Sequence, residues 1–168
     1  MANLPTAVTI EYDRLVSADD WEGVRILLAP LLKSGHAEAL YLCAMASQPG
    51  ESEEEFHARH VESVRVAAES GYAPAMFTQG MYHLFGDMAP LDKESAARNF
   101  AAAARQGYPA AQYEYGLALL HGVGIPTDPL EGRRLIHAAA AAGNECAQEF
   151  TRAERGDGSS ADGKEQAG

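Results

Sequence analysis

The six histidines are the side chains of this sequence that most readily suggest acid–base or metal chemistry. His57 and His60 stand three residues apart, a spacing that places both on one face of a helix. Zinc needs a third and a fourth ligand, and no cysteine or further histidine follows at ligand spacing. A metal site or a hydrolase built on this pair is therefore only a remote alternative. The isolated histidines are expected to be surface or packed side chains: His36, His83, His121 and His137.

No motif of nucleotide or acyl-transfer chemistry accompanies these histidines. The sequence contains no P-loop, no dinucleotide-binding glycine pattern and no G-x-S-x-G. Gly122-Val123-Gly124 is glycine-rich, but its place in the chain predicts a tight turn between two helices. We therefore predict a protein with no catalytic residues, no cofactor and no metal.

Charge and composition favour some partners over others. The formal net charge is −11, and residues 1–72 hold 12 acidic against 5 basic side chains. This disfavours a nucleic-acid partner, because phosphate binding needs clustered positive charge. The first residues lack the basic and apolar parts of a signal peptide or membrane span, which predicts a cytoplasmic protein with no membrane insertion. Cys43 and Cys146 are expected to stay reduced.

The elements that position these residues repeat every 36 residues. Such a strict period, held from Gly35 to Gly143 without an insertion, indicates a stacked-repeat architecture. The recurring positions are Gly35, Gly71, Gly107 and Gly143; Ala39, Ala75, Ala111 and Ala147; and Gly80 with Gly116.

The period divides the chain into units of two helices. We expect one helical-repeat domain over residues 1–155, followed by a disordered tail over 156–168. Within the domain, 1–35 is a degenerate first unit, 36–71, 72–107 and 108–143 are repeats, and 144–155 is a capping helix.

Capping residues predict where the helices begin and end. Pro30 is expected to kink or divide the helix that leads to Gly35, and this glycine is expected just beyond the helix end. The expected N-terminal caps are Ser17 paired with Asp20, Ser52 paired with Glu55, Asp92, and Asp128 followed by Pro129.

The stretch from Ala111 to Gly143 resembles the Sel-1-like repeat, a relative of the tetratricopeptide repeat with a longer loop. It reads A-x-x-x-Y-G-x-x-L-x-x-G-x-G-I-x-x-D-x-x-x-G-x-x-L-x-x-x-A-A-x-x-G. The unit from Ala75 to Gly107 shares most of its small residues but departs from the pattern at Gln79 and His83. The preceding unit keeps the small residues and lacks the loop pattern.

The resemblance implies an all-α, right-handed superhelical solenoid of antiparallel helix pairs, with about three to four repeats and a C-terminal capping helix. It also implies that the first helix of each pair lines a concave surface. Members of this family usually act as adaptors that bind proteins or peptides.

Two sets of residues on the first helices recur at the same interval. Helical spacing places them away from the small residues that face the second helix of each pair. Aromatic and methionine side chains offer a large, adaptable contact area, which predicts a peptide-binding surface. An equally weighted alternative is that they form the core between repeats, because every solenoid needs such contacts. The predicted binding residues are Tyr41, Met45, Phe77, Met81, Tyr113, Leu117, Leu120 and His121, with Leu84, Glu38, Gln48 and Glu149 at the margin.

These observations predict a non-catalytic adaptor or scaffold that binds a protein or peptide partner in the concave groove. The alternative is a structural subunit that self-associates through its terminal repeats, as a weak homo-oligomer. The remote alternative is the hydrolase or metal-binding protein considered above.

Overall fold

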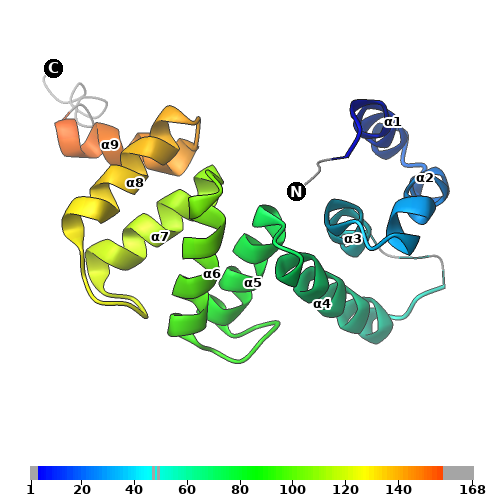
Figure 1. The fold of residues 1–168 in the computed structure, drawn as a ribbon, viewed down its shortest axis with the longest axis horizontal. Coiled ribbons are helices and arrows are strands. Elements are labelled where there is room, and N and C mark those ends of the chain that lie inside the picture. The colour runs from blue at the N-terminus through cyan, green and yellow to red at the C-terminus, as the bar shows by residue number, and fades with distance from the viewer. Residues whose placement is uncertain (1–3, 47, 49, 157–168) are drawn as a thin grey trace, which may run out of the picture. The chain divides into compact units, whose positions relative to one another are not determined.

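The computed structural model describes residues 4–46, 48 and 50–156. These residues form nine helices and no strand, so the predicted all-α fold is confirmed. Figure 1 shows the helices in chain order from α1 to α9. Most of the predicted tail lies outside the described residues, and only Gly156 is seen, in the left-handed conformation that ends the last helix.

The helices form two compact units, Met1–Leu91 and Asp92–Gly168. The division falls inside the predicted repeat 72–107, whose two helices belong to different units, and the single domain over residues 1–155 stays a prediction. The first unit contains α1 (Thr6–Ser17), α2 (Trp21–Lys33), α3 (Ala37–Ala44), α4 (Glu53–Glu69) and α5 (Ala73–Phe85). The second contains α6 (Lys93–Arg105), α7 (Pro109–His121), α8 (Pro129–Ala141) and α9 (Glu145–Arg155).

The start of α2 differs from the prediction. Asp20 is the N-cap, and its side chain accepts a hydrogen bond of 2.8 Å from the Gly23 N–H. Ser17 instead ends α1, where its hydroxyl donates to the Asp13 carbonyl at 2.7 Å. The capping box predicted for Ser17 is wrong, because the chain turns between the helices through Asp19 at φ 57° and the cap falls after that turn.

Pro30 does not divide α2, which continues to Lys33. A proline inside a helix removes one backbone hydrogen bond. Here the helix ends within its next turn, while Leu28 on one side of the proline and Leu31 on the other pack into the same core. The helix is continuous through Pro30, so the predicted division is wrong, and the kink stays a prediction.

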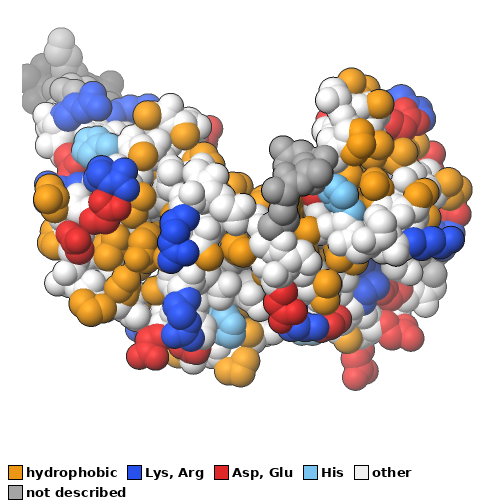
Figure 2. Space-filling view, viewed as in Figure 1, with side chains coloured by type: hydrophobic (Ala, Val, Ile, Leu, Met, Phe, Trp, Pro, Cys, Tyr) orange, Lys and Arg blue, Asp and Glu red, His pale blue; other side chains and the backbone are white. Residues whose placement is uncertain are grey.

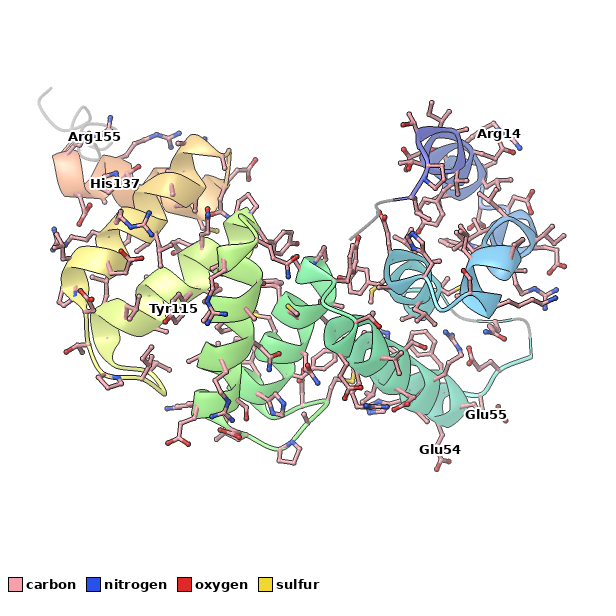
Figure 3. All side chains as sticks on the ribbon, viewed as in Figure 1. Arg14, Glu54, Glu55, Tyr115, His137 and Arg155 are labelled. Carbon is pink, nitrogen blue, oxygen red and sulfur yellow. The ribbon has the colours of Figure 1, made fainter. Side chains whose placement is uncertain are left out.

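The other predicted caps are confirmed. Ser52 and Glu55 form a complete capping box at the start of α4, with the Ser52 N–H donating to Glu55 Oε2 at 2.9 Å. Figure 3 shows Glu54 and Glu55 in this first turn, where carboxylates complement the helix dipole. Asp92 and Asp128 likewise accept hydrogen bonds from backbone N–H groups in the first turns of α6 and α8.

Small side chains allow α7 and α8 to cross closely. A Cβ added to Gly116 would lie 2.7 Å from Ile136 Cγ1 and 2.8 Å from the Gly132 carbonyl oxygen. A Cβ added to Gly132 would lie 2.7 Å from the Gly116 carbonyl oxygen. The predicted role of Gly116 at the contact with the second helix is thus confirmed.

The loop between α7 and α8 turns through two glycines and rests on the start of α6. Gly122 has φ 71° and Gly124 has φ 69°, both in the left-handed region. A Cβ added to Gly124 would lie 2.0 Å from the Lys93 carbonyl oxygen. The predicted tight turn is confirmed, and its second glycine is also required for contact with a neighbouring helix.

The last helix, α9, buries one side and leaves a polar side free. Ala147 and Thr151 are buried against the preceding helices, whereas Glu149, Arg152 and Arg155 are exposed. Arg152 stands 36 residues after Gly116, the position through which α7 contacts α8. The free side of α9 is therefore charged, and the capping role of residues 144–155 stays a prediction.

Candidate functional site

His57 and His60 occupy different environments on α4. His57 is exposed, whereas His60 is buried. His60 Nδ1 lies 2.8 Å from the Ala44 carbonyl oxygen, and Nε2 is in contact with the Tyr82 hydroxyl. The described residues contain no group of three His, Cys, Asp or Glu side chains placed to hold a metal ion. The two histidines thus do not converge on one site.

His60 links three helices of the first unit by hydrogen bonds. A carbonyl oxygen only accepts, so Nδ1 carries the proton and donates to Ala44 at the end of α3. In a neutral ring Nε2 then accepts from the Tyr82 hydroxyl of α5. Burial raises the pKa of Tyr82 to about 12, with smaller contributions from the charges of Tyr41 and Asp87. This network explains His60 as a structural residue.

The repeat register shows why a histidine fits there. His60 stands 36 residues before Ala96 and 72 before Gly132. Gly132 approaches the carbonyl oxygen of Gly116 directly, and His60 approaches the carbonyl oxygen of Ala44, the residue equivalent to Gly116. At the crossing of α7 and α8 the two backbones are in direct contact. At the equivalent crossing of α3 and α4, the His60 side chain lies between the two backbones.

Arg59 binds the end of α3 and the loop that follows it. Its guanidinium donates to the Cys43 carbonyl at 2.9 Å and to the Ala46 carbonyl at 2.7 Å. It also forms an ion pair with Glu51, with Arg59 Nε 2.6 Å from Oε1. Cys43 and Cys146 are both free, and burial raises the pKa of the Cys43 thiol.

We expect the Glu51–Arg59 pair to make unfolding depend on pH in acid. Hydrogen bonds from Arg59 lower the pKa of Glu51 from an ordinary 4.5 to about 2, despite the opposing effect of burial. The ionised form therefore stabilises the folded chain above pH 4.5, and this stabilisation is lost as the pH falls toward 2. Urea midpoints measured between pH 5 and 2.5 should fall more steeply for the wild type than for Glu51→Gln.

Glu53→Gln provides the control, because Glu53 is exposed in the first turn of α4, whereas the ion pair of Arg59 is with Glu51. Its midpoints should follow those of the wild type. Parallel curves for the wild type and Glu51→Gln would contradict the expectation.

In the first unit, the predicted binding residues on α3 and α5 are partly accessible. The Tyr41 hydroxyl lies 3.1 Å from Thr78 Oγ1, and its ring centroid is 5.4 Å from that of Tyr72. Met45 caps the end of α3 and is 43% exposed. Phe77 and Met81 are half-buried. Tyr41 thus joins α3 to α5 and packs against a core cluster, while Met45 remains open to solvent.

In the second unit, the predicted binding residues of α7 also contact the core. Tyr113, Leu117 and Leu120 are half-buried and pack against the cluster of Ile136, Ala139 and Ala147 from α8 and α9. His121 at the helix end is exposed. These residues therefore contact the core and also remain partly accessible to solvent. Their role in binding a peptide stays a prediction. In Figure 2, apolar side chains are interspersed with charged ones across the visible face.

One residue that the periodic pattern did not indicate is Glu114. It is half-buried on α7, and burial raises the pKa of its carboxyl. The equivalent residues one and two repeats earlier are Thr78 and Leu42, so no residue type recurs at this position. Helical spacing places Glu114 on the same face of α7 as Ala110 and His121, and this spacing could have indicated it from the sequence.

Comparison with known proteins agrees with this geometry. The Sel1 repeat family matches residues 73–108 and 109–144. This chain contains two Sel1 repeats. The matched repeats lie one residue beyond the predicted 72–107 and 108–143. No curated protein sequence is a significant match to this chain.

Two solved structures share its helical repeat solenoid. A Sel1 repeat protein from Oxalobacter formigenes is 27% identical, with a TM-score of 0.69 over 77% of this chain and 98% of the other. A protective antigen of uropathogenic Escherichia coli with an SLR fold is 23% identical, with a TM-score of 0.65 over 89% of this chain. The Sel1-like repeat chain spans 36% of the length of that antigen. None of the helices in its described part is long and apolar enough to cross a bilayer.

Proposed function

We propose that this protein is a non-catalytic adaptor that binds a protein or peptide partner along the first helices of its repeats. The Sel1 repeat solenoid typically mediates protein interaction, which supports the class of function. Stacked repeats present an extended surface on which specificity can be built from scattered residues.

The observation that carries the proposal is the position of the recurring apolar residues. Tyr113 and Leu117 use one side of their side chains for the core, and they are not fully buried. Met45 is more exposed than a core residue would be. Side chains that are held by the core on one side and accessible on the other form rigid contact points for a ligand.

The proposal is tested by incubating the full chain with an array of immobilised random 12-residue peptides. We expect Met45→Glu and Leu117→Glu to weaken capture of the bound peptides about tenfold or more, because each places a charge in an apolar contact. Leu130→Glu is the matched control, since Leu130 is 83% exposed on α8, outside the predicted surface.

Circular dichroism melting separates binding from folding. Met45 is exposed, so Met45→Glu should keep the wild-type melting temperature even if Leu117→Glu lowers it. The proposed function would be rejected if the wild type captured no peptide. It would also be rejected if Leu130→Glu weakened capture as much as both of the other variants.

A further inference from the structure

Glu114 is a half-buried carboxylate that has no hydrogen-bond or ion-pair partner in the described part of the chain. Burial is the single cause of its raised pKa, and no neighbouring charge opposes it. Burying a carboxylate without a partner disfavours its charged form. A bound cationic group would favour the charged form again.

The other half-buried carboxylates of the described residues have partners. Glu51 forms its ion pair with Arg59, and Glu131 forms one with Arg134 at 2.6 Å. Asp92 accepts from the Ser95 N–H at 3.0 Å. Glu38 accepts from the Leu4 N–H at 2.7 Å. Glu114 is thus the exception within a chain that otherwise pairs such groups.

The contact of Glu38 shows how a carboxylate on a first helix can hold a segment that precedes the helices. Glu38 lies in the first turn of α3, and Leu4 lies before α1, with its side chain 6% exposed in the core cluster. A backbone donor and an adjacent leucine together attach this segment. The chain therefore already contains one example of an acidic group on a first helix binding a segment from outside its own repeat.

Glu114 follows Tyr113 directly on α7, and Tyr113 packs against the core cluster of α8 and α9. The pKa of Tyr113 is raised first by burial, and then by the charges of Cys146, Glu114 and Glu149. Two carboxylates therefore act on the Tyr113 hydroxyl, one from α7 and one from α9. Leu117, one turn beyond Tyr113 on α7, packs against the same core cluster and is half-buried.

We propose that Glu114 accepts the lysine or arginine side chain of a peptide bound along α7, with Tyr113 and Leu117 contacting the aliphatic part of that side chain. This inference rests on the proposed function and assigns a partner chemistry to its site. A charge-assisted hydrogen bond gives the half-buried carboxylate the partner it lacks. Lysine and arginine stems pack on apolar surface while their charged ends bind acidic groups.

The experiment uses the peptides captured by the full wild-type chain on the random 12-residue array. We expect lysine and arginine to be enriched in them. For the tightest peptide, replacing each lysine by norleucine or each arginine by citrulline in turn should identify one basic position, at which affinity falls about tenfold to a hundredfold in fluorescence polarisation. Glu114→Gln should lower the affinity for the original peptide by a similar factor, and Glu145→Gln, at an exposed position on α9, should not.

A melting measurement separates binding from a structural role. Glu114→Gln removes a half-buried charge that has no partner, so the melting temperature of this variant should equal or exceed that of the wild type. A lower melting temperature would show that Glu114 stabilises the fold, and would overturn the inference. If peptides were captured without enrichment in lysine or arginine, and Glu114→Gln had no effect, the inference would be overturned and the proposed function would stand. If no peptide were captured at all, both the inference and the proposed function would be rejected.

Discussion

Replacing Gly124 by alanine is expected to destabilise the protein by about 3 kcal/mol or more, the largest effect of any single substitution considered. Two costs combine at this position. The backbone has φ 69°, which an L-residue with a Cβ rarely adopts. The new methyl group would also lie 2.0 Å from the Lys93 carbonyl oxygen and 2.3 Å from its carbon, both of them backbone atoms that a rotamer change cannot move.

Urea unfolding followed by circular dichroism measures this loss. Gly143→Ala is the matched control, because Gly143 has φ 91° but no atom within 4 Å of the position that a Cβ would take. It should cost only the backbone strain, about 1 kcal/mol. Equal losses for the two variants would show that the loop does not depend on its contact with the start of α6.

Replacing His60 by alanine is expected to destabilise the protein by about 3 kcal/mol. The substitution removes the hydrogen bonds to the Ala44 carbonyl and to the Tyr82 hydroxyl, and it leaves a cavity where the ring was buried. The Ala44 carbonyl and the Tyr82 hydroxyl would then have no hydrogen bond to His60 in a region with little access to water. The same urea titration measures the effect.

His57→Ala is the control for His60→Ala, because it removes the same side chain from the same helix at an exposed position. Its effect should stay within about 0.5 kcal/mol. Tyr82→Phe should show an intermediate loss of about 1 kcal/mol, since it removes one hydroxyl and keeps the ring. If His60→Ala were no more harmful than His57→Ala, His60 would not be the link between α3, α4 and α5.

Features set by near neighbours in the sequence were predictable. The box of Ser52 with Glu55 and the cap at Asp128 depend on residues within one turn, and both are found as expected. The cap at Ser17 and the division at Pro30 were predicted wrongly, because the outcome there depends on more than the local pattern. A left-handed residue at Asp19 moves the start of α2, and core packing carries that helix past its proline.

In the candidate site, too, local features were predictable from the sequence and features that depend on packing were not. The period placed Tyr113 and Leu117 together on α7, but only the packing of α8 and α9 shows how far each is buried. Glu114 was missed because the equivalent positions of the two preceding repeats are Leu42 and Thr78, so no residue type recurs there. The partners of His60 lie 16 and 22 residues away, and no spacing in the sequence connects them.

The charged free side of α9 determines how the array could grow. A second helix after α9 would have to approach through Arg152 and Arg155, which replace the small and apolar residues Gly116 and Leu119 of α7. Two arginines cannot be buried there without acidic partners. A helix that packed on α9 as α8 packs on α7 would therefore have to supply acidic partners for these two side chains.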